Sequence, residues 1–504
     1  MSAHLDVVVV GAGLSGVGAA YRLQTERPGT TYAVLEARDD LGGTWDLFRY
    51  PGIRSDSDMF TLGYSFKPWT DEKSIADGAT ILSYIRETAA EAGIEARIRF
   101  RTKVVAADWS TADERWHLTL EVRGEDGTTT REELTCGFLY SCAGYYDYDQ
   151  GHAPDFPGAD DFEGTLVHPQ FWPEDLDYAS KRVVVIGSGA TAVTLVPSMA
   201  REAGHVTMLQ RTPTWISAVP SRDKVADRLR ATLPAPLAHR LVRTKNILFG
   251  IGFYQFCQQR PAQARKLLTG LTTKILGDPA MVAEHFTPDY DPWDQRLCAV
   301  PSADLFTAIK RGDADVVTDR IARFVPEGVL LESGRLLEAD VVVTATGLRL
   351  KAFGGIAPRV DGEVVPLAEQ FVWRGAMVTG IPNFAVCVGY TNASWTLRAD
   401  LTHRLVCKVL DHLERRGLAA VAPVAEEGVE ERPLLDLAAG YVQRSIHEFP
   451  RQGDRGPWRV RQNYLLDSLL TLRGDLGRHL RPFGPAAARD GEPAAATEDQ
   501  LAAV

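Results

Sequence analysis

The stretch Val7-Val8-Val9-Val10-Gly11-Ala12-Gly13-Leu14-Ser15-Gly16 decides the fold. An apolar run that leads directly into G-x-G-x-x-G predicts a strand, a tight turn and a helix. Gly11 allows the turn, Gly13 lets the backbone approach a pyrophosphate, and Gly16 lets the helix pack closely on the strand. The helix N-terminus then faces the phosphates with its positive end.

Working outward, we expect a strand at 6–10, a helix from about 14 to 24 and a second strand at 31–35. Glu36 follows that second strand, 20 residues after Gly16. A carboxylate at this offset accepts hydrogen bonds from a ribose 2′-hydroxyl. The sequence therefore predicts a dinucleotide site built from Gly11, Gly13, Ser15, Gly16 and Glu36.

A second signature of the same kind begins at Gly187. It reads Gly187-Ser188-Gly189-Ala190-Thr191-Ala192 and follows an apolar run at 183–186. We expect a strand at 182–186, a helix at 190–201 and a strand at 206–210. Arg211-Thr212 then stands where the first unit has Glu36, and a guanidinium grips a 2′-phosphate that a carboxylate would repel. This difference favours NADP over NAD, although a surface arginine after a strand remains the alternative.

The rest of the chain indicates a nested arrangement. Residues 222–283 carry leucines at helical spacing, which indicates helices that wall a cavity or serve only a structural role. Short strands that end in small residues, at 138–144 and 340–347, are typical of crossings between two nucleotide domains. The expected order is a first domain at 1–150 and 339–481, a second at 151–221 and 290–338, a helical insertion at 222–289 and a disordered tail at 482–504.

Composition excludes several classes of protein. The chain has 504 residues, of which 45% are hydrophobic and 24% charged, as in ordinary globular proteins. Its net charge of -11 argues against binding to nucleic acid or to an anionic membrane. No apolar run reaches the roughly 18 residues of a membrane-spanning helix. The first strand begins within five residues of the N-terminus, so we expect no secretory signal and a cytoplasmic location.

The six cysteines contain no C-x-x-C pair. Their spacing predicts neither a disulfide framework nor a metal site, and it excludes the redox-active disulfide of many other proteins with two nucleotides. We interpret them as buried small hydrophobes in a reducing compartment.

A further element lies between the nucleotide signatures: Phe162-x-Gly164-x-x-x-His168-x-x-x-Trp172-Pro173. With it, the chain resembles the flavin-dependent Baeyer–Villiger monooxygenases. The Trp172-Pro173 ending resembles the ketone-oxidising branch rather than the related enzymes that oxidise nitrogen and sulfur. The resemblance implies that Phe162, Gly164, His168 and Trp172 couple domain rotation to cofactor position.

Longer matches at 43–58, 291–298 and 389–396 are similar to the ethionamide-activating subgroup, and the resemblance covers about residues 5–475. It implies an α/β fold with two Rossmann-like domains, for FAD and NADP, the second inserted in the first. The cofactors it implies are FAD and NADPH. It assigns further cofactor contacts to Thr44, Trp45, Asp46, Leu47, Arg54, Asp56 and Val104. Two residues depart from the wider pattern, since Ser55 replaces a cysteine and Gln295 replaces a lysine linked to NADPH recognition.

The activity implied by the resemblance depends on NADPH and O2. A C4a-peroxyflavin would insert oxygen into ketones to give esters or lactones and would also oxygenate sulfides or thioamides. Arg296 would supply the catalytic cation, and Asp56 would orient it. An interdomain salt bridge for Arg296 and a helix cap for Asp56 remain the structural alternatives. A dedicated S- or N-oxygenase and a non-catalytic flavin-binding redox sensor remain the functional ones.

Overall fold

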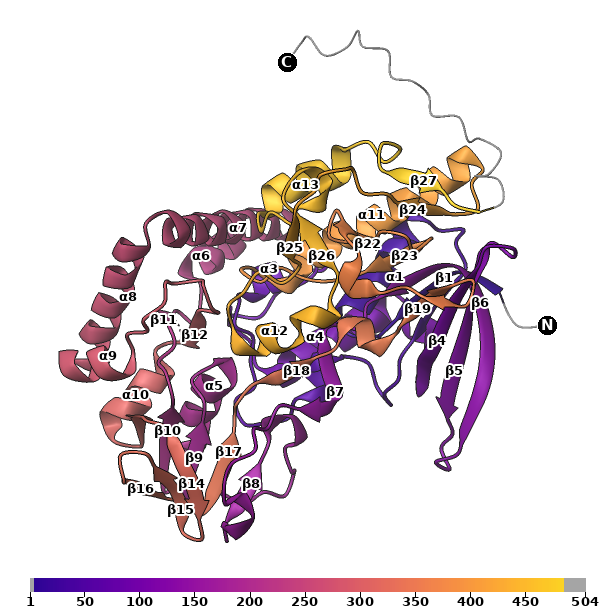
Figure 1. The fold of residues 1–504 in the computed structure, drawn as a ribbon. Coiled ribbons are helices and arrows are strands. Elements are labelled where there is room, and N and C mark those ends of the chain that lie inside the picture. Colours follow the sequence, from indigo (N-terminus) through magenta and orange to yellow (C-terminus); the bar gives the residue numbers. More distant parts are fainter. Residues whose placement is uncertain (1–3, 485–504) are drawn as a thin grey trace.

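The computed structural model describes residues 4–484. Figure 1 shows two β-sheets on opposite sides of the molecule, with a group of helices beside the second sheet. The strands at the centre of each sheet are runs of valine, isoleucine and leucine that are buried on both faces. Such runs are typical of parallel strands that are covered on both sides.

The first sheet has eleven strands and is built around β1 (His4–Val10), which pairs in parallel with its two neighbours. An antiparallel meander extends one side of it. The main path runs β20 (Glu363–Val364), β19 (Pro358–Val360), β4 (Thr102–Ser110), β5 (Arg115–Arg123), β6 (Thr129–Ser141), β1, β2 (Tyr32–Leu35) and β3 (Ile98–Arg99). A branch from β6 carries β23 (Phe384–Val386), β22 (Met377–Val378) and β21 (Val372–Trp373).

The second sheet has five strands, and every pairing within it is parallel. Its order is β13 (Ala314–Thr318), β10 (His205–Gln210), β9 (Arg182–Ile186), β17 (Val341–Thr344) and β8 (Thr165–Val167). The strand and helix bounds of both predicted nucleotide units agree with the structure to within about two residues. Helices α5 (Ala190–Met199) and α10 (Asp304–Arg311) pack against each other beside this sheet.

The chain passes between the sheets along two neighbouring strands. β7 (Tyr146–Gly151) leads out of the first sheet, and β18 (Leu348–Leu350) leads back antiparallel to it. All five strands of the second sheet lie between them in sequence, which is the nested order. One expected boundary needs correction: β17 pairs with β9 and β8 in the second sheet, although we assigned residues from 339 onward to the first domain. Its buried valines fit either sheet, so their pattern could not decide between them.

The predicted helical insertion consists of four helices. They are α6 (Lys224–Thr232), α7 (Ala235–Gln259), α8 (Pro261–Leu276) and α9 (Pro279–His285). A short parallel pair, β11 (Ile216–Val219) and β12 (Cys298–Pro301), joins the chain just before and just after these helices. Beside the second sheet, β14 (Ile321–Val325), β15 (Gly328–Leu331) and β16 (Leu336–Glu338) form a small antiparallel sheet.

The remaining helices surround the first sheet. They are α1 (Leu14–Glu26), α2 (Thr44–Leu47), α3 (Met59–Leu62), α4 (Gly78–Glu91), α11 (Trp395–Arg416), α12 (Gly440–Ser445) and α13 (Tyr464–Arg473). Two antiparallel pairs complete the C-terminal region: β24 (Val421–Pro423) with β27 (Leu480–Pro482), and β25 (Glu431–Pro433) with β26 (Arg451–Gly453).

The start of the predicted disordered tail is ordered. Pro482 pairs with Val421, and the Phe483 N–H donates to the Ala420 carbonyl. Composition suggested disorder, but the strand pairing fixes these residues. The rest of the predicted tail, residues 485–504, lies outside the described residues.

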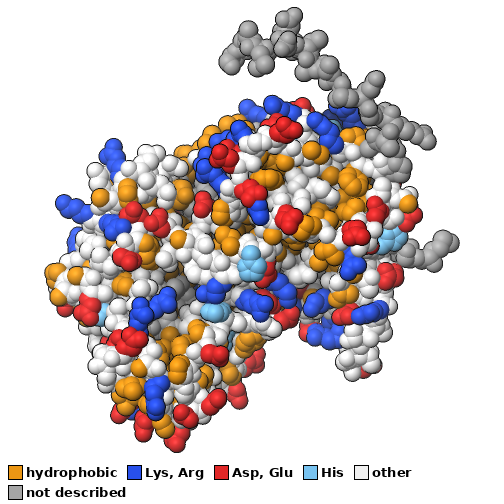
Figure 2. Space-filling model, viewed as in Figure 1, with side chains coloured by type: hydrophobic (Ala, Val, Ile, Leu, Met, Phe, Trp, Pro, Cys, Tyr) orange, Lys and Arg blue, Asp and Glu red, His pale blue; other side chains and the backbone are white. Residues whose placement is uncertain are grey.

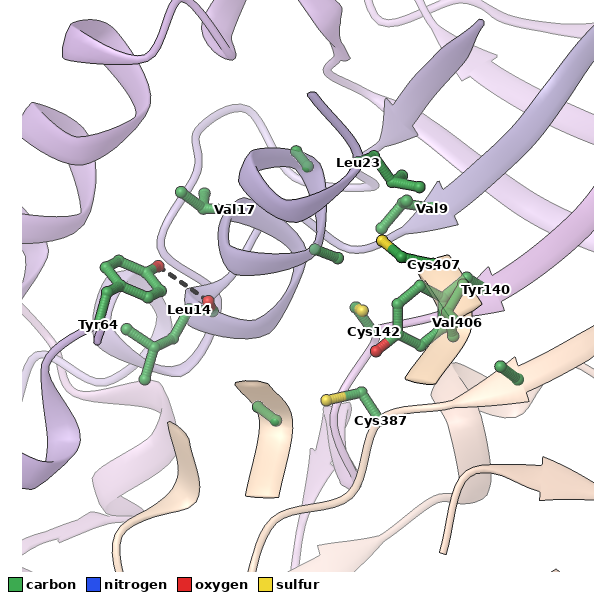
Figure 3. Close-up of a cluster of buried hydrophobic side chains, with 14 of the residues drawn as sticks. Val9, Leu14, Val17, Leu23, Tyr64, Tyr140, Cys142, Cys387, Val406 and Cys407 are labelled. Atoms are coloured by element: carbon green, nitrogen blue, oxygen red, sulfur yellow. Dashed lines mark hydrogen bonds between the residues drawn. The ribbon is translucent and has the colours of Figure 1, made fainter. Parts of the chain in front are cut away.

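The hydrophobic core that positions the first nucleotide turn lies between α1, the first sheet and α11. Figure 3 shows Val17 and Leu23 of α1 on one side of it, and Tyr140, Cys142 and Val406 on the other. The Tyr64 hydroxyl donates to the carbonyl of Leu14 at 2.8 Å. These contacts fix the position of the first turn of α1.

Candidate functional site

A single cavity of about 1530 Å³ lies between the two sheets, and both glycine signatures line it. Ligand pockets for one small molecule usually measure roughly 300–1,000 Å³. The larger volume and the two signatures together indicate a space for more than one ligand. Its wall includes the first glycine turn, the region around α2, the second glycine turn and the charged residues Arg296 and Asp56.

The first glycine turn has the geometry that the sequence predicted. Gly11 has φ +97, and a Cβ there would lie 2.8 Å from the Cys142 carbonyl, so only glycine fits. A Cβ on Gly16 would lie 1.8 Å from the carbonyl oxygen of Gly11, which confirms its role in close packing. Gly13 caps α1 without a side-chain hydrogen bond, so the first N–H groups of the helix remain available to an anion.

Glu36 lies buried at the end of β2 and lines the cavity. Its two carboxylate oxygens accept from the N–H groups of Ala12 at 2.7 Å and Arg38 at 2.9 Å. Burial is the main cause that raises the pKa of Glu36. Ser15, the remaining predicted residue of this turn, lines the cavity and accepts from the Trp395 indole N–H at 2.7 Å.

The predicted contacts around α2 divide into two groups. Thr44, Trp45, Asp46 and, from β4, Val104 line the cavity, whereas Leu47 packs against the core beside the second sheet. Asp46 is buried and forms ion pairs with Arg38 and Arg49, each at 2.7 Å. We infer that Asp46 holds the two arginines in place.

The second glycine turn is more open. Gly189 caps α5 without a side-chain hydrogen bond, and a Cβ on it would meet nothing within 4 Å. Gly187, Ser188, Ala190 and Thr191 also line the cavity, whereas Ala192 is fully buried in the core behind it. The Ser188 hydroxyl donates to the Thr212 carbonyl at 3.0 Å. Arg211 and Thr212 lie at the cavity, and within residues 4–484 Arg211 forms no ion pair.

The structure brings Arg296 and Asp56 together, although 240 residues separate them in sequence. Arg296 Nη2 and Asp56 Oδ2 form an ion pair on the cavity wall. They lie deep in the molecule, yet 33% of the Arg296 side chain and 35% of the Asp56 side chain stay open, because the cavity adjoins them. The Asp56 carboxylate is the main cause that raises the pKa of Arg296 well above its usual value. Arg296 is therefore a fixed positive charge.

Neighbouring residues test the structural alternatives for this pair. Asp58, not Asp56, caps α3, because its side chain accepts from the Thr61 N–H at 3.0 Å. Arg54 lines the cavity but forms an ion pair with Asp304, at the first turn of α10. Ser55 is buried and accepts from the Ala76 N–H, and Gln295 lines the cavity. The helix-cap interpretation of Asp56 is thus wrong.

Three tyrosines around Arg296 were not predicted. Tyr145 and Tyr146 come from the crossing into β7, and Tyr441 comes from α12. Tyr441 lies beside Arg296, and burial raises the pKa of Tyr441 to about 12. The small residues and glycine before Tyr145 marked the crossing and could have indicated the first two. No sequence signal pointed to Tyr441.

The four residues expected to couple domain rotation to cofactor position do not line the cavity. None of Phe162, Gly164, His168 and Trp172 is among the residues that line it. His168 sits beside the crossing strand β7, where a Cβ on Gly151 would lie 2.3 Å from the imidazole, and its Nδ1 accepts from the Gln170 N–H. Burial lowers the pKa of His168. Phe162 packs edge-on against Phe324, and Trp172 against Tyr178.

One group of possible metal ligands was not expected from cysteine spacing. Cys142, Cys387 and His403 are buried, with ligand atoms within 4.8 Å of one another. They belong to a polar network in which the Tyr140 hydroxyl bonds His403 Nδ1 at 2.6 Å. Cys142 and Cys387 lie beside Tyr140 in Figure 3. Strand pairing of β6 with β23 brings the cysteines together, which spacing along the chain could not show.

The cavity fits two dinucleotides on three grounds. Two helix N-termini without side-chain caps face it, which suits two pyrophosphates. Glu36 could accept from the hydroxyl groups of one ribose, and Arg211 could pair with a 2′-phosphate. The arrangement can therefore hold an electron-carrying pair of nucleotides in a cavity whose wall also carries the Arg296 cation.

Comparison with known proteins agrees with this geometry. Residues 5–226 match the family described as Flavin-binding monooxygenase-like. The chain is 52% identical over 479 residues to the FAD-containing monooxygenase EthA of Mycobacterium tuberculosis, covering 94% of this chain and 97% of that protein. This chain belongs to the flavin-binding monooxygenases. A flavin-binding monooxygenase is an oxidoreductase, so the redox-sensor alternative is not supported.

Solved structures extend the comparison. A steroid monooxygenase bound to NADP is 25% identical with a TM-score of 0.68, covering 84% of this chain and 88% of that chain. A cyclohexanone monooxygenase is 23% identical with a TM-score of 0.69, covering 84% and 90%, and shows the same fold. This flavin-binding monooxygenase uses FAD and NADP as cofactors. No helix among residues 4–484 is long and apolar enough to cross a membrane.

Proposed function

We propose that this flavin-binding monooxygenase inserts one oxygen atom of O2 beside the carbonyl of a ketone, and that it also oxygenates sulfides or thioamides. For a ketone the balance is ketone, O2, NADPH and a proton to ester or lactone, NADP⁺ and water. The observation that carries the proposal is the Arg296–Asp56 ion pair on the wall of a cavity that both nucleotide turns line. The name of the cyclohexanone monooxygenase, which shares this fold, supports a ketone substrate.

Arg296 is placed to stabilise the negative charge that develops on oxygen during this reaction. A preorganised cation acts strongly where water is excluded, since it does not need to reorient as the charge appears. Asp56 holds the guanidinium in an ion pair, so that it cannot turn away from the cavity. Asp56 is therefore a positioning residue and Arg296 the catalytic one.

The cofactors divide the remaining work. When bound, FAD supplies the redox and oxygen-activating chemistry, which protein side chains lack. Gly11, Gly13, Ser15 and Glu36 would hold it at the first turn, with Thr44, Trp45, Asp46, Arg54 and Val104 beside it. Gly187, Ser188, Gly189, Ala190, Thr191, Arg211 and Thr212 would hold NADPH at the second. Gly16, Leu47 and Ala192 would support these sites from behind.

Three further assignments belong to the proposal. The nested partition into domains accounts for the paired strands β7 and β18, with the return to the first domain placed after β17. Phe162, Gly164, His168 and Trp172 would couple domain movement to cofactor position, because none of them lines the cavity and His168 lies beside β7. A cytoplasmic location is compatible with six free, buried cysteines.

The test is the Arg296→Ala variant. It should keep FAD but form product roughly 10²-fold more slowly or worse, the scale for losing one preorganised electrostatic contact. Asp56→Ala should fall in the same direction, and the double variant should be little worse, since the residues act as a unit. The measurement is ester or sulfoxide formed per NADPH consumed, over a panel of ketones and thioethers. Unchanged product formation in Arg296→Ala would refute the catalytic assignment, and sulfoxides without any ester would indicate a dedicated S-oxygenase.

A further inference from the structure

Helix α13 has its hydrophobic side on the outside. Leu465, Leu466, Leu469 and Leu470 are 42–49% exposed, whereas Asp467 and Thr471 are 3% and 2% exposed. The spacing of the four leucines places them on one helix face. Asp467 faces inward, where it accepts from the Tyr390 hydroxyl at 2.8 Å. A helix that buries its polar side and exposes leucine is the reverse of an ordinary surface helix.

A second apolar surface belongs to α7 and α8 of the helical insertion. Phe249 is 72% exposed, and its ring stacks on that of Phe253. The other exposed apolar side chains of these helices are Leu237, Leu241, Leu248, Leu267 and Leu271. Ile247 and Ile251 of α7 belong to one hydrophobic cluster with Tyr464, at the start of α13, so the two surfaces adjoin.

The charge of this region is opposite to that of the whole protein. The chain has 66 acidic and 55 basic residues, yet residues 235–276 contain no Asp or Glu. They contain seven basic residues, and four of these are exposed: Arg240, Arg260, Lys266 and Lys274. Arg243 is buried, and Lys245 and Arg265 form ion pairs with Asp223 and Asp291. Near α13, residues 459–481 carry five arginines against Asp467 and Asp475. Figure 2 shows hydrophobic and basic side chains, with some acidic ones among them, over the upper part of the molecule, where Figure 1 places α7 and α13.

We propose that the exposed faces of α7, α8 and α13 dock on the surface of an anionic lipid bilayer. Apolar side chains interleaved with lysine and arginine are the pattern of helices that lie in the membrane interface. The negative net charge of the chain argues against such binding, but residues 235–276 carry no acidic residue, and the exposed Arg240, Arg260, Lys266 and Lys274 give their surface a local positive charge. Because peripheral docking needs no spanning helix, it is compatible with the helices observed.

The surface borders the cavity. Tyr390 lines the cavity, belongs to the hydrophobic cluster with Ile247, and donates to Asp467 of α13. Docking would therefore bring the wall of the cavity close to the bilayer. An apolar substrate dissolved in the lipid would then have a short path to the site.

The test is flotation of the FAD-loaded full-length protein with vesicles. Vesicles of phosphatidylcholine with phosphatidylglycerol should carry the wild type, whereas pure phosphatidylcholine should carry much less, and salt should weaken the binding. Phe249→Ser combined with Leu466→Gln and Leu470→Gln should abolish flotation. Lys266→Gln with Lys274→Gln should weaken it about 25-fold, since each surface lysine contributes about fivefold.

The matched control is Val364→Gln, because Val364 is 53% exposed on β20 of the first sheet. It should float like the wild type, and FAD content and thermal midpoint should confirm that all variants are folded. Absence of flotation with phosphatidylglycerol, or equal flotation of wild type and both surface variants, would overturn the proposal. A wild-type dimer that the Phe249 variant dissociates, without vesicle binding, would instead assign the face to a second copy of the chain.

Discussion

The two glycine turns have the same sequence pattern but different surroundings. At the first turn Glu36 is buried and bound by two backbone N–H groups, and Gly13 faces the backbone of Gly43 at 3.4 Å from its ideal Cβ. At the second turn Gly189 faces open space, and Arg211 is exposed without an ion pair among the described residues. The first turn is packed more tightly by its own protein, as suits a cofactor that stays bound. The second is open, as suits a nucleotide that must enter and leave.

The largest expected effect is the difference in cofactor binding between alanine substitutions in the first and second glycine turns. Gly11→Ala should give protein with little or no FAD, because alanine must adopt φ +97 with its Cβ 2.8 Å from a carbonyl oxygen. Gly189→Ala should keep FAD and lose only affinity for NADPH, since its Cβ meets no protein atom within 4 Å. Flavin absorbance per protein and the KM for NADPH measure the two outcomes.

A suitable control is Gly29→Ala, whose Cβ also meets nothing within 4 Å, and which should retain both cofactors. Loss of FAD from Gly189→Ala to the same extent as from Gly11→Ala would show that the two turns are not independent. The comparison between a closed and an open site would then fail.

A smaller effect is expected from the cation at the open site. Arg211→Ala should lower kcat/KM for NADPH roughly 10- to 150-fold, which corresponds to about 1.5–3 kcal/mol for one charge-assisted contact. The value for NADH should hardly change, because NADH lacks the 2′-phosphate, so it serves as the internal control. Equal values for NADPH and NADH in the wild type, unaltered by the substitution, would remove Arg211 from the site.

The smallest expected effect is the loss of folding stability at acid pH that is caused by the buried His403. Burial lowers the pKa of His403 to about 3, so this residue is neutral in the folded protein at ordinary pH. The unfolded chain would bind a proton near pH 6.5, so stability that is present above that pH is lost as pH falls toward 3. Between pH 7.5 and pH 5 the loss should be about 2 kcal/mol.

Thermal unfolding of the FAD-loaded protein at pH 7.5 and pH 5 measures this difference. The midpoint of His403→Gln should fall less than that of the wild type, since glutamine does not titrate. His205→Gln, at the partly exposed start of β10, should behave as the wild type does. An equal fall of the thermal midpoint in all three proteins would show that His403 does not cause the acid sensitivity.

Local patterns carried most of the fold prediction. Short sequence segments predict the strands and helices of both nucleotide units, the helical insertion and the positive φ of Gly11. Each of these features depends mainly on residues that are neighbours along the chain. Strand β17 shows the limit of local prediction. Its four buried residues suit either sheet, and only its pairing with β9 assigns it to the second sheet. The ordering of Pro482 likewise depends on a partner strand about 60 residues earlier.

The sequence by itself determined two dinucleotide turns, the acidic and basic residues that follow them, and the family to which they belong, because these features are written in contiguous residues. Only the tertiary structure decided that Asp56 meets Arg296 and that Tyr441 lies beside the same guanidinium. It also turned the leucines of α13 outward beside an acid-free pair of helices. Such contacts join residues far apart along the chain, and no local backbone preference encodes which distant side chain will complete them.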